Sequence, residues 1–307
     1  IGSHLVDRLL QAQHHVRVFD NFSTGQRRFL AGAQTNDQFE LIEGDLIHEQ
    51  QIEVAMRGVD FVWHLAANAD VRFGTDQPRR DLEQNTIATS NVLEAMRKNE
   101  VRHIAFSSTG SIYGEASVIP TPEDCPMPVQ TSLYGASKLA CEGMISAYCE
   151  GFDMQSWIFR FVSILGERYT HGHIFDFYRR LLNDPDHLHI LGNGKQRKSY
   201  LYIHDCLNAM FKAIEAAPDS VNILNLGPDE YVEVNDSVDL ITDYLELKPE
   251  RSYAGGERGW IGDSPFIFLK CDRMRSLGWQ PEHSIHDGIL KTLKWLEQNH
   301  WVLEARE

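Results

Sequence analysis

Apolar residues recur in two alternating periods along the first 165 residues. Leu5, Val6, Leu9 and Leu10 follow the spacing of a helix face, and residues 15–19 then have the pattern of a strand that ends at Asp20. Further strands are predicted for residues 39–42, 60–67, 101–107 and 154–165, and helices for residues 81–98 and 134–150. This alternation indicates βαβ units, and therefore a parallel sheet covered by helices on both faces.

The remainder of the chain is less regular. Its pattern predicts helices at residues 173–183 and 204–216, the second capped by His204 and Asp205, and strands at residues 199–203 and 221–226. Short strands and two more helices follow in residues 227–307. We therefore predict a sheet domain formed by residues 1–165, to which residues 199–226 return, and a smaller mixed α/β lobe formed by residues 166–198 and 227–307.

A glycine and an acidic residue at the start of the chain match half of a dinucleotide-binding fingerprint. Gly2 opens the first helix, and Asp20 ends the next strand 18 residues later. The helix N-terminus can receive a pyrophosphate, and Asp20 can bind a ribose diol while repelling a 2′-phosphate, which favours NAD over NADP. We expect a Rossmann-like, doubly wound fold whose first strand and part of whose glycine loop are missing from this sequence.

Tyr134 and Lys138 lie four residues apart in a predicted helix, so their side chains share one face. A free phenol has a pKa near 10, but a neighbouring ammonium stabilises the phenolate. Such a pair can take a proton from a hydroxyl group as hydride leaves the same carbon. The alternative is a Tyr and a Lys on a solvated helix face, and the surrounding sequence favours the catalytic interpretation.

Small hydroxyl residues close the strand that precedes this helix. Ser107, Ser108, Thr109 and Ser111 stand where parallel sheets bind their ligands, beyond the carboxyl end of a strand. Thr109 is predicted to bind the reacting oxygen. For Ser107 the favoured interpretation is a hydroxyl that satisfies backbone groups at the strand end.

Together these motifs resemble the extended short-chain dehydrogenase/reductase family, in its NAD-dependent nucleotide-sugar epimerase and dehydratase group, and most of all its UDP-glucose 4-epimerase-like members. The resemblance runs from Gly2 to Leu277-Gly278-Trp279. It implies a catalytic trio of Thr109, Tyr134 and Lys138. It also implies NAD contacts from Gly2, Asp20, Asn21, Asp45, Leu46, Leu65, Ala66, Ala67, Asn85, Ser107, Tyr134, Lys138 and Phe161.

The same resemblance places a nucleoside diphosphate in the second lobe. It implies substrate contacts from Ser163, Ile190, Arg197, Lys198, Arg258 and Asp263. The family usually has an Arg at the position of Lys198, so either Arg197 or Lys198 could bind the diphosphate. It usually has an Asn at the position of Ser163, so the identity of the sugar also stays open.

The residues after Thr109 separate reactions within the family. Dehydratases and decarboxylases usually carry an acid there, whereas this chain has Gly110 and Ser111. We therefore expect NAD-dependent 4-epimerisation of a UDP-hexose through a transient 4-keto sugar. The alternatives are an NAD(P)H-dependent 4-ketosugar reductase, a sugar-nucleotide dehydratase, and a catalytically dead nucleotide-binding protein.

Composition narrows the partners. A formal charge of −15 argues against nucleic acid or an anionic membrane as partner, and against a broad basic face. Five cysteines without CxxC spacing indicate buried free thiols, and with no membrane-spanning run or secretory signal we expect a cytoplasmic protein. His171, His173, His187 and His189 lack the companions of a metal site, so none is predicted. The resemblance implies a homodimer formed through residues 81–98 and 134–150.

Overall fold

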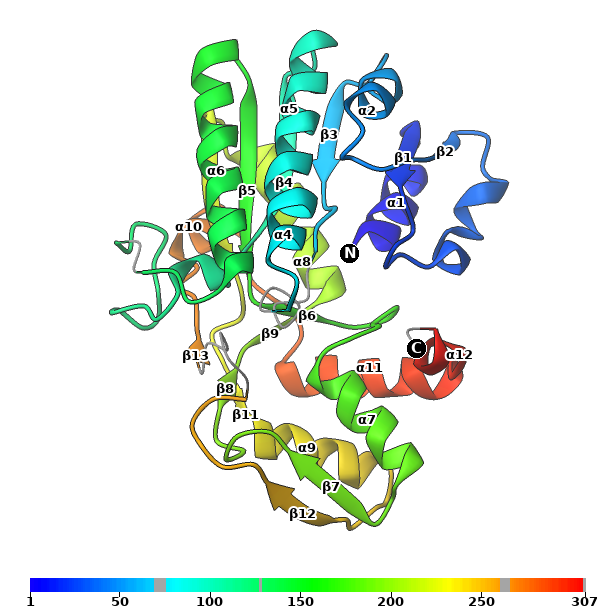
Figure 1. Cartoon of the computed structure of the whole chain (residues 1–307), viewed down its shortest axis with the longest axis vertical. Coiled ribbons are helices and arrows are strands. Elements are labelled where there is room, and N and C mark those ends of the chain that lie inside the picture. The colour runs from blue at the N-terminus through cyan, green and yellow to red at the C-terminus, as the bar shows by residue number, and fades with distance from the viewer. Residues whose placement is uncertain (69–75, 127–128, 260–265, 306–307) are drawn as a thin grey trace. The chain divides into compact units, whose positions relative to one another are not determined.

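The computed structural model describes residues 1–68, 76–126, 129–259 and 266–305 (Figure 1). The chain forms two compact units. The first comprises residues 1–108, 133–159 and 217–223, and the second comprises residues 109–132, 160–216 and 224–307. These units differ from the predicted division at residues 109–132, 160–165, 199–216 and 224–226, which belong with the second unit.

Parallel strands form the centre of the first unit. Strands β1 (Val16–Asp20) and β2 (Phe39–Glu43) pair in parallel, with Val16 opposite Phe39. A four-stranded sheet has the order β10-β5-β4-β3, and its β3 and β4 are also parallel. Its strands are β3 (Phe61–His64), β4 (His103–Thr109), β5 (Gln155–Phe161) and β10 (Val221–Leu226). This is the Rossmann-like α/β arrangement that the alternating pattern predicts.

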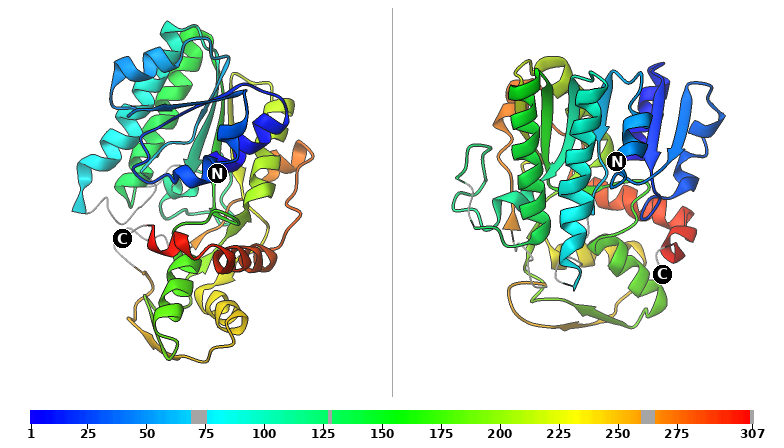
Figure 2. Two further views of the ribbon diagram at one scale, coloured as in Figure 1. Left: turned by 90° about the vertical axis from the view of Figure 1, so that its right-hand side faces the viewer. Right: turned by 45° about the horizontal axis from the view of Figure 1, so that its top comes forward.

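The first unit contains helices α1 (Gly2–Gln11) and α2 (Glu49–Ala55). A longer helical run comprises α4 (Pro78–Asp81), a π-helical segment η3 (Leu82–Ile87) and α5 (Ala88–Lys98). Helix α6 (Leu133–Phe152) lies beside α5, and both cover the same face of the sheet (Figure 2). The core between helices and sheet is apolar, and includes Leu93, Met96, Ile104, Phe106, Ile145 and Ile158.

The second unit has small sheets and flanking helices. Strand β6 (Ser163–Leu165) pairs in parallel with β9 (Tyr200–Tyr202), and β7 (His187–Ile190) pairs in parallel with β12 (Glu250–Tyr253). A third sheet has the order β11-β8-β13, formed by Val232–Glu233, Arg197–Lys198 and Phe266–Ile267. Its helical segments are η4 (Gly110–Tyr113), α7 (His173–Asn183), α8 (Ile203–Ala216), α9 (Val234–Tyr244), α10 (Asp272–Ser276), α11 (Ile285–Gln298) and α12 (Trp301–Glu304).

Three details differ from the prediction. The single strand expected at residues 154–165 is two strands in different sheets, because the backbone N–H of Val162 donates to Leu226 O and the chain then takes β9 as its neighbour. Among the described residues, the segment after residue 227 holds four helices where two are predicted. His204 and Asp205 do not precede helix α8, which starts at Ile203; instead Asp205 accepts hydrogen bonds from the backbone N–H and Nδ1 of His283.

The cysteine prediction is confirmed. All five cysteines lie in the described part of the chain, are buried and form no disulfide. No helix within the described ranges has the length and apolar character needed to cross a bilayer.

Candidate active site

A polar pocket of about 550 Å³ opens beyond the carboxyl ends of β1, β2 and β3 in the first unit. Its size is that of a small-molecule site. Its walls come from Asn21, Ser23, Thr24, Asp45, Ala67, Asn68, Gln77, Pro78, Arg79, Arg80, Glu83 and Gln84. Ligands of open parallel sheets bind at this edge, so the fold itself places a ligand site here.

Three of the residues predicted to bind a dinucleotide line this pocket. Asn21 donates from Nδ2 to Asp45 Oδ2 at 3.0 Å, which joins the ends of β1 and β2, and Ala67 follows β3. The carboxylate of Asp20 accepts the backbone N–H of Phe22 at 2.7 Å and so shapes the turn after β1. Leu46, Leu65 and Ala66 stand next to these residues in the chain.

At Gly2, helix α1 comes close to the segment after β3. A Cβ atom built at Gly2 would lie 4.0 Å from Leu65 Cδ1, which is ordinary contact. The sequence interpretation of Gly2 as a close-approach glycine therefore stays a prediction.

Tyr134 and Lys138 lie one turn apart near the start of α6, as the sequence predicts. Lys138 is buried, and its Nζ donates to Ser107 O at 2.7 Å and lies 4.5 Å from the centre of the Phe106 ring. Burial lowers the pKa of Lys138 from 10.5 to about 8, so the side chain is still charged at neutral pH. A compact cation is thus held rigidly one turn from the tyrosine.

Asn85 fixes the start of this helix from the π-helical segment. It accepts the backbone N–H of Asn68 at 2.8 Å, and its Nδ2 donates to Ser137 Oγ at 2.8 Å. Ser137 in turn donates to Tyr134 O at 2.8 Å. The wider π turn, a feature often found at functional sites, therefore holds an amide that links the pocket wall to the turn carrying Tyr134.

Thr109 is the last residue of β4. Its Oγ1 accepts the backbone N–H of Ser111 at 3.1 Å and caps the short helix η4, so a role toward substrate stays a prediction. Ser107 donates weakly to His64 O at 3.4 Å, in keeping with the backbone-satisfying interpretation, while its carbonyl binds Lys138.

Gly110 is tightly enclosed. A Cβ atom at this position would lie 2.7 Å from Ile267 Cγ2 and 3.3 Å from Phe161 O. Position 110 therefore has no room for an acidic side chain without movement of its neighbours. Phe161, predicted to contact NAD, is buried at the end of β5.

The two predicted diphosphate ligands stand side by side on strand β8 of the second unit and face different surroundings. The guanidinium of Arg197 lies 4.3 Å from the Phe266 ring centre and 5.5 Å from that of Tyr231. Burial, together with the charge of Lys198, lowers the pKa of His173 to about 3. Successive strand residues point to opposite faces, so only one of the two can face the same ligand.

Lys198 belongs to a cluster at the start of β9. The Tyr200 hydroxyl is hydrogen-bonded to the imidazole of His173, and Tyr200 is the register partner of Ser163 across β6 and β9. Ser163 itself is exposed. The structure therefore brings Ser163 near the group of Tyr200, His173 and Lys198.

The other residues predicted to contact the substrate have different surroundings. Arg258 forms an ion pair with Glu115. Ile190 is fully buried at the end of β7, so its side chain packs in the core. Asp263 lies outside the described residues.

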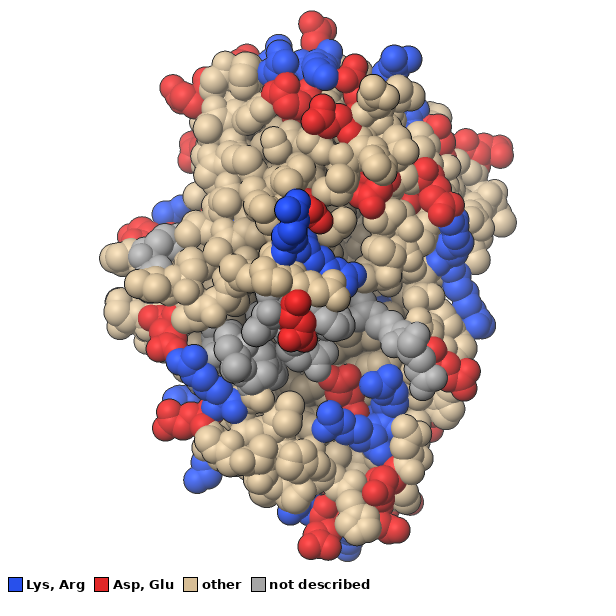
Figure 3. Space-filling model, viewed as in Figure 1, with Lys and Arg blue, Asp and Glu red and all other residues tan. Residues whose placement is uncertain are grey.

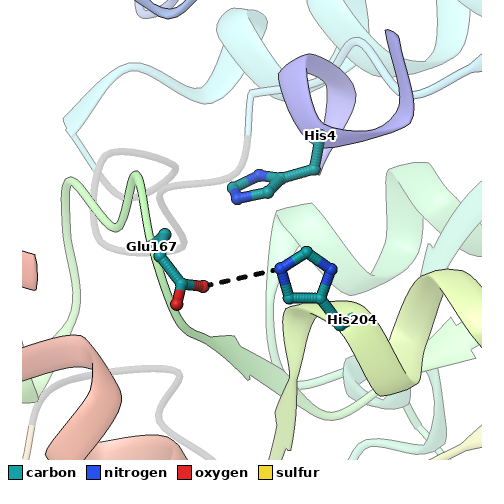
Figure 4. A group of neighbouring side chains, drawn as sticks. All are labelled: His4, Glu167 and His204. Atoms are coloured by element: carbon teal, nitrogen blue, oxygen red, sulfur yellow. Dashed lines mark ion pairs between the residues drawn. The ribbon is translucent and has the colours of Figure 1, made fainter. Parts of the chain in front are cut away.

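The histidines singled out in the sequence have separate partners. His187 pairs with Asp184, and His189 contacts Ser252 Oγ at 3.0 Å. His204 Nε2 lies 3.8 Å from Glu167 Oε2 (Figure 4), and that carboxylate also accepts the Tyr202 hydroxyl at 3.0 Å.

Sequence reasoning missed the wall of the pocket formed by residues 77–84. Pro78 starts a helix there, and Arg79 and Arg80 follow. Two adjacent arginines are unusual in a chain with a net charge of −15, and this pair is the sequence signal that could have indicated the pocket wall. Acidic and basic side chains are interspersed on the face shown in Figure 3, which has no broad basic surface.

Comparisons with known proteins agree with this geometry. The profile of the NAD dependent epimerase/dehydratase family matches residues 1–227. A putative UDP-glucose 4-epimerase of Methanocaldococcus jannaschii is 30% identical over 305 residues, which cover 97% of this chain and 96% of that protein.

Solved structures show the same likeness. A crystal structure of a UDP-galactose 4-epimerase has a TM-score of 0.87 and 35% identity, covering 98% of this chain and 96% of its own. A UDP-glucose 4-epimerase of Thermus thermophilus, solved in complex with NAD, has a TM-score of 0.85 and 28% identity, covering 96% and 95%. With its parallel sheet, its pocket at the strand ends and its Tyr134–Lys138 pair, this chain belongs to the NAD dependent epimerase/dehydratase family.

Proposed function

We propose that the protein is an NAD-dependent 4-epimerase of a UDP-hexose. The observation that carries this proposal is the pair formed by Tyr134 and the buried, charged Lys138, combined with the enclosed Gly110. The pair supplies a base for a sugar hydroxyl, and the glycine leaves no space for the acid that elimination requires. The relatives described as UDP-glucose and UDP-galactose 4-epimerases support the same reaction.

The pocket of the first unit suits the family's cofactor. The Asn21–Asp45 pair offers hydrogen-bonding groups, and the wall adds two cations for a pyrophosphate, Arg80 and Arg79, the second of which is ion-paired with Glu83. Bound NAD would supply the acceptor, and afterwards the donor, of the hydride at sugar C4. The contribution of this chain is to hold the cofactor and to manage the proton of the sugar hydroxyl.

Tyr134 takes the proton from O4 of the sugar as the C4–H bond breaks. Lys138 stabilises the resulting phenolate because it follows Tyr134 by one helical turn and its charge is shielded from water. Thr109 binds O4 in both the alcohol and the ketone. Tyr134 returns the proton once the 4-keto sugar has presented its other face, so each cycle leaves the enzyme unchanged.

Two other reactions of this family are less well supported. Dehydration needs a further acid or base near C5 or C6, and the enclosed Gly110 disfavours one beside Thr109. A 4-ketosugar reductase would consume NADPH, whose 2′-phosphate would meet the carboxylates near the pocket at Asp20 and Asp45. A protein that only binds nucleotides would have no need of a charged lysine kept out of water.

A direct assay tests the proposal. The protein is incubated with NAD and, separately, with UDP-glucose, UDP-N-acetylglucosamine and UDP-glucuronate, and the products are separated from their C4 epimers by chromatography. We expect the C4 epimer from at least one of the three. Absence of an epimer in every case, with NAD bound, would exclude UDP-hexose 4-epimerase activity.

The two cations of β8 should contribute unequally to substrate binding. We expect Lys198→Ala to raise KM for the UDP-sugar roughly 10–100-fold with a smaller change in kcat, as loss of a hydrogen bond to a charged group predicts. Arg197→Ala should have a several-fold smaller effect, because that guanidinium stacks on Phe266 and Tyr231. Steady-state kinetics of both variants decide the point, and a larger effect of Arg197→Ala would reverse the assignment.

The homodimer is predicted from the family resemblance, and exposed apolar side chains of the helical segments support it. Leu82 and Ile87 of η3 and Phe152 of α6 are exposed by 48%, 37% and 39%. We expect light scattering to give the mass of a dimer at micromolar concentration, and Ile87→Glu to give a monomer. Val54→Glu, at an exposed position on α2, is the matched control. A wild-type monomer at that concentration would contradict the dimer.

A further inference from the structure

Helix α6 carries a third chemically active side chain on the stripe that contains Tyr134 and Lys138. Glu142 follows Lys138 by four residues and Tyr134 by eight, so all three lie on one helix face. Glu142 is only 4% exposed. Glutamate is almost never this deeply buried without a specific partner.

Ser108 is a partner of this carboxylate. Its hydroxyl donates a hydrogen bond to Glu142 Oε1, and Ser108 itself is buried on β4 between Ser107 and Thr109. The carboxylate is thus fixed to the strand whose preceding residue, Ser107, binds the Lys138 ammonium through its carbonyl. The helix and the strand hold Lys138 and Glu142 in one rigid frame.

Lys138 needs an anion nearby because water does not reach it. The groups that act on it are the ring of Phe106 and the carbonyl of Ser107 on β4, His64 on β3, and Cys141 and Glu142 on its own helix. Burial and the Lys138 charge lower the pKa of His64 to about 3, so His64 is neutral. Burial raises the pKa of the Cys141 thiol, so that group is also neutral near pH 7.

Among the described groups that act on Lys138, this leaves Glu142 as the carboxylate that can balance its charge. We propose that Glu142, anchored by Ser108, is a positioning residue that keeps Lys138 protonated and in place to support the Tyr134 phenolate. The expected effect of Glu142 on turnover rests on the proposed function. Its expected effect on the charge of Lys138 does not depend on that function.

The test measures Lys138 directly. Lysine labelled with ¹³C at Cε is incorporated, and the Lys138 signal is identified by its absence in Lys138→Met. In the wild type we expect it to titrate near pH 8. In Glu142→Gln the midpoint should fall by about one unit or more, because a nearby opposite charge has been removed. Glu142→Asp should give an intermediate midpoint.

Glu150→Gln is the matched control, since Glu150 is an exposed acid on the same helix. In Glu150→Gln the midpoint of the Lys138 titration should equal that of the wild type. An unchanged midpoint in Glu142→Gln would overturn the proposal. If that variant does not fold, Glu142→Asp decides, and a midpoint equal to the wild-type value would then overturn it.

Kinetics add a readout that a purely structural role would not change. In Glu142→Gln the alkaline limb of the pH profile of kcat should move to lower pH, in step with the Lys138 midpoint, and a uniform loss at every pH would contradict this. If the wild-type protein epimerises none of the UDP-sugars, the proposed function fails, and the NMR titration still tests the pairing of Glu142 with Lys138.

Discussion

Tyr134→Phe will lower kcat for C4 epimerisation by about 10²–10⁴-fold, the usual contribution of a positioned general base. The substitution removes the phenolic oxygen and leaves the ring. Tyr134 is partly exposed at the start of α6, so the variant should fold and melt like the wild type. Turnover of the best UDP-sugar and a thermal melt give the two measurements.

Tyr148→Phe is the control for this variant. Tyr148 lies on the same helix, and its hydroxyl donates to Glu94 Oε1, so the same atom is removed at a position without a predicted chemical role. We expect this control to keep wild-type turnover. If Tyr134→Phe kept more than about a tenth of wild-type kcat, against the 10²-fold minimum expected of a base, another group would have to be the base.

Lys138→Met should abolish most turnover and at the same time stabilise the fold. Without the ammonium, the Tyr134 phenolate loses its electrostatic support, and we expect kcat at pH 7 to fall by at least about 10²-fold. The methionine fits an environment that already includes the Phe106 ring, and it removes a charge from a buried site. Because burial lowers the pKa of Lys138 despite the attraction of Glu142, removing the ammonium relieves a net cost, and Ser108 still binds the Glu142 carboxylate.

The stability effect has a defined pH dependence. The pKa of Lys138 falls from 10.5 to about 8 on folding, so the unfolded chain holds this proton more tightly than the folded protein. The free-energy cost of keeping Lys138 charged in the folded protein is therefore fully present below pH 8, and it disappears as the pH rises through 10.5. Lys138→Met should raise the free energy of unfolding by about 1–3 kcal/mol at pH 7 and by little near pH 10.5, as the difference between the two pKa values implies.

Denaturant unfolding at pH 7 and at pH 10 measures this difference, with Lys138→Arg as the control that retains a cation. A loss of stability at pH 7 would show that the contacts of the ammonium with Ser107 O and the Phe106 ring outweigh its burial. A loss of turnover joined to a gain of stability would be the signature of a residue retained for function.

Local signals in the sequence were strong enough to predict the parallel sheet domain and the helix that carries Tyr134 and Lys138. The sequence has a strand period at Val16–Asp20 and a helix period at Leu133–Phe152, and the two differ clearly. Within the helix, the four-residue spacing of Tyr134 and Lys138 places both side chains on one face. The buried cysteines also followed from composition.

The break at Val162 could not be predicted, because the apolar run continues through it while the backbone changes its partner strand. The π-helical segment at Leu82–Ile87 was equally hidden, since only the buried contacts of Asn85 make the wider turn favourable. These features depend on neighbours distant in the sequence.

At the site, the sequence identified Asn21, Asp45 and Ala67 but not the pocket wall after Gln77, whose charged residues resemble a solvated helix face. Glu142 was missed for the same reason. An acid eight residues after a tyrosine is unremarkable until the structure shows that it is buried and bound by Ser108.

Reversible oxidation at sugar C4 is the chemistry that Tyr134 and Lys138 are proposed to serve. The most direct measurement uses the UDP-sugar that the protein epimerises, carrying deuterium at C4, with NAD and no added reductant, followed by NMR of the product. We predict a C4 epimer that keeps its deuterium at C4 and takes up no hydrogen there from solvent. A dehydrated 4-keto sugar, or C4 inversion with loss of the deuterium to water, would contradict this chemistry.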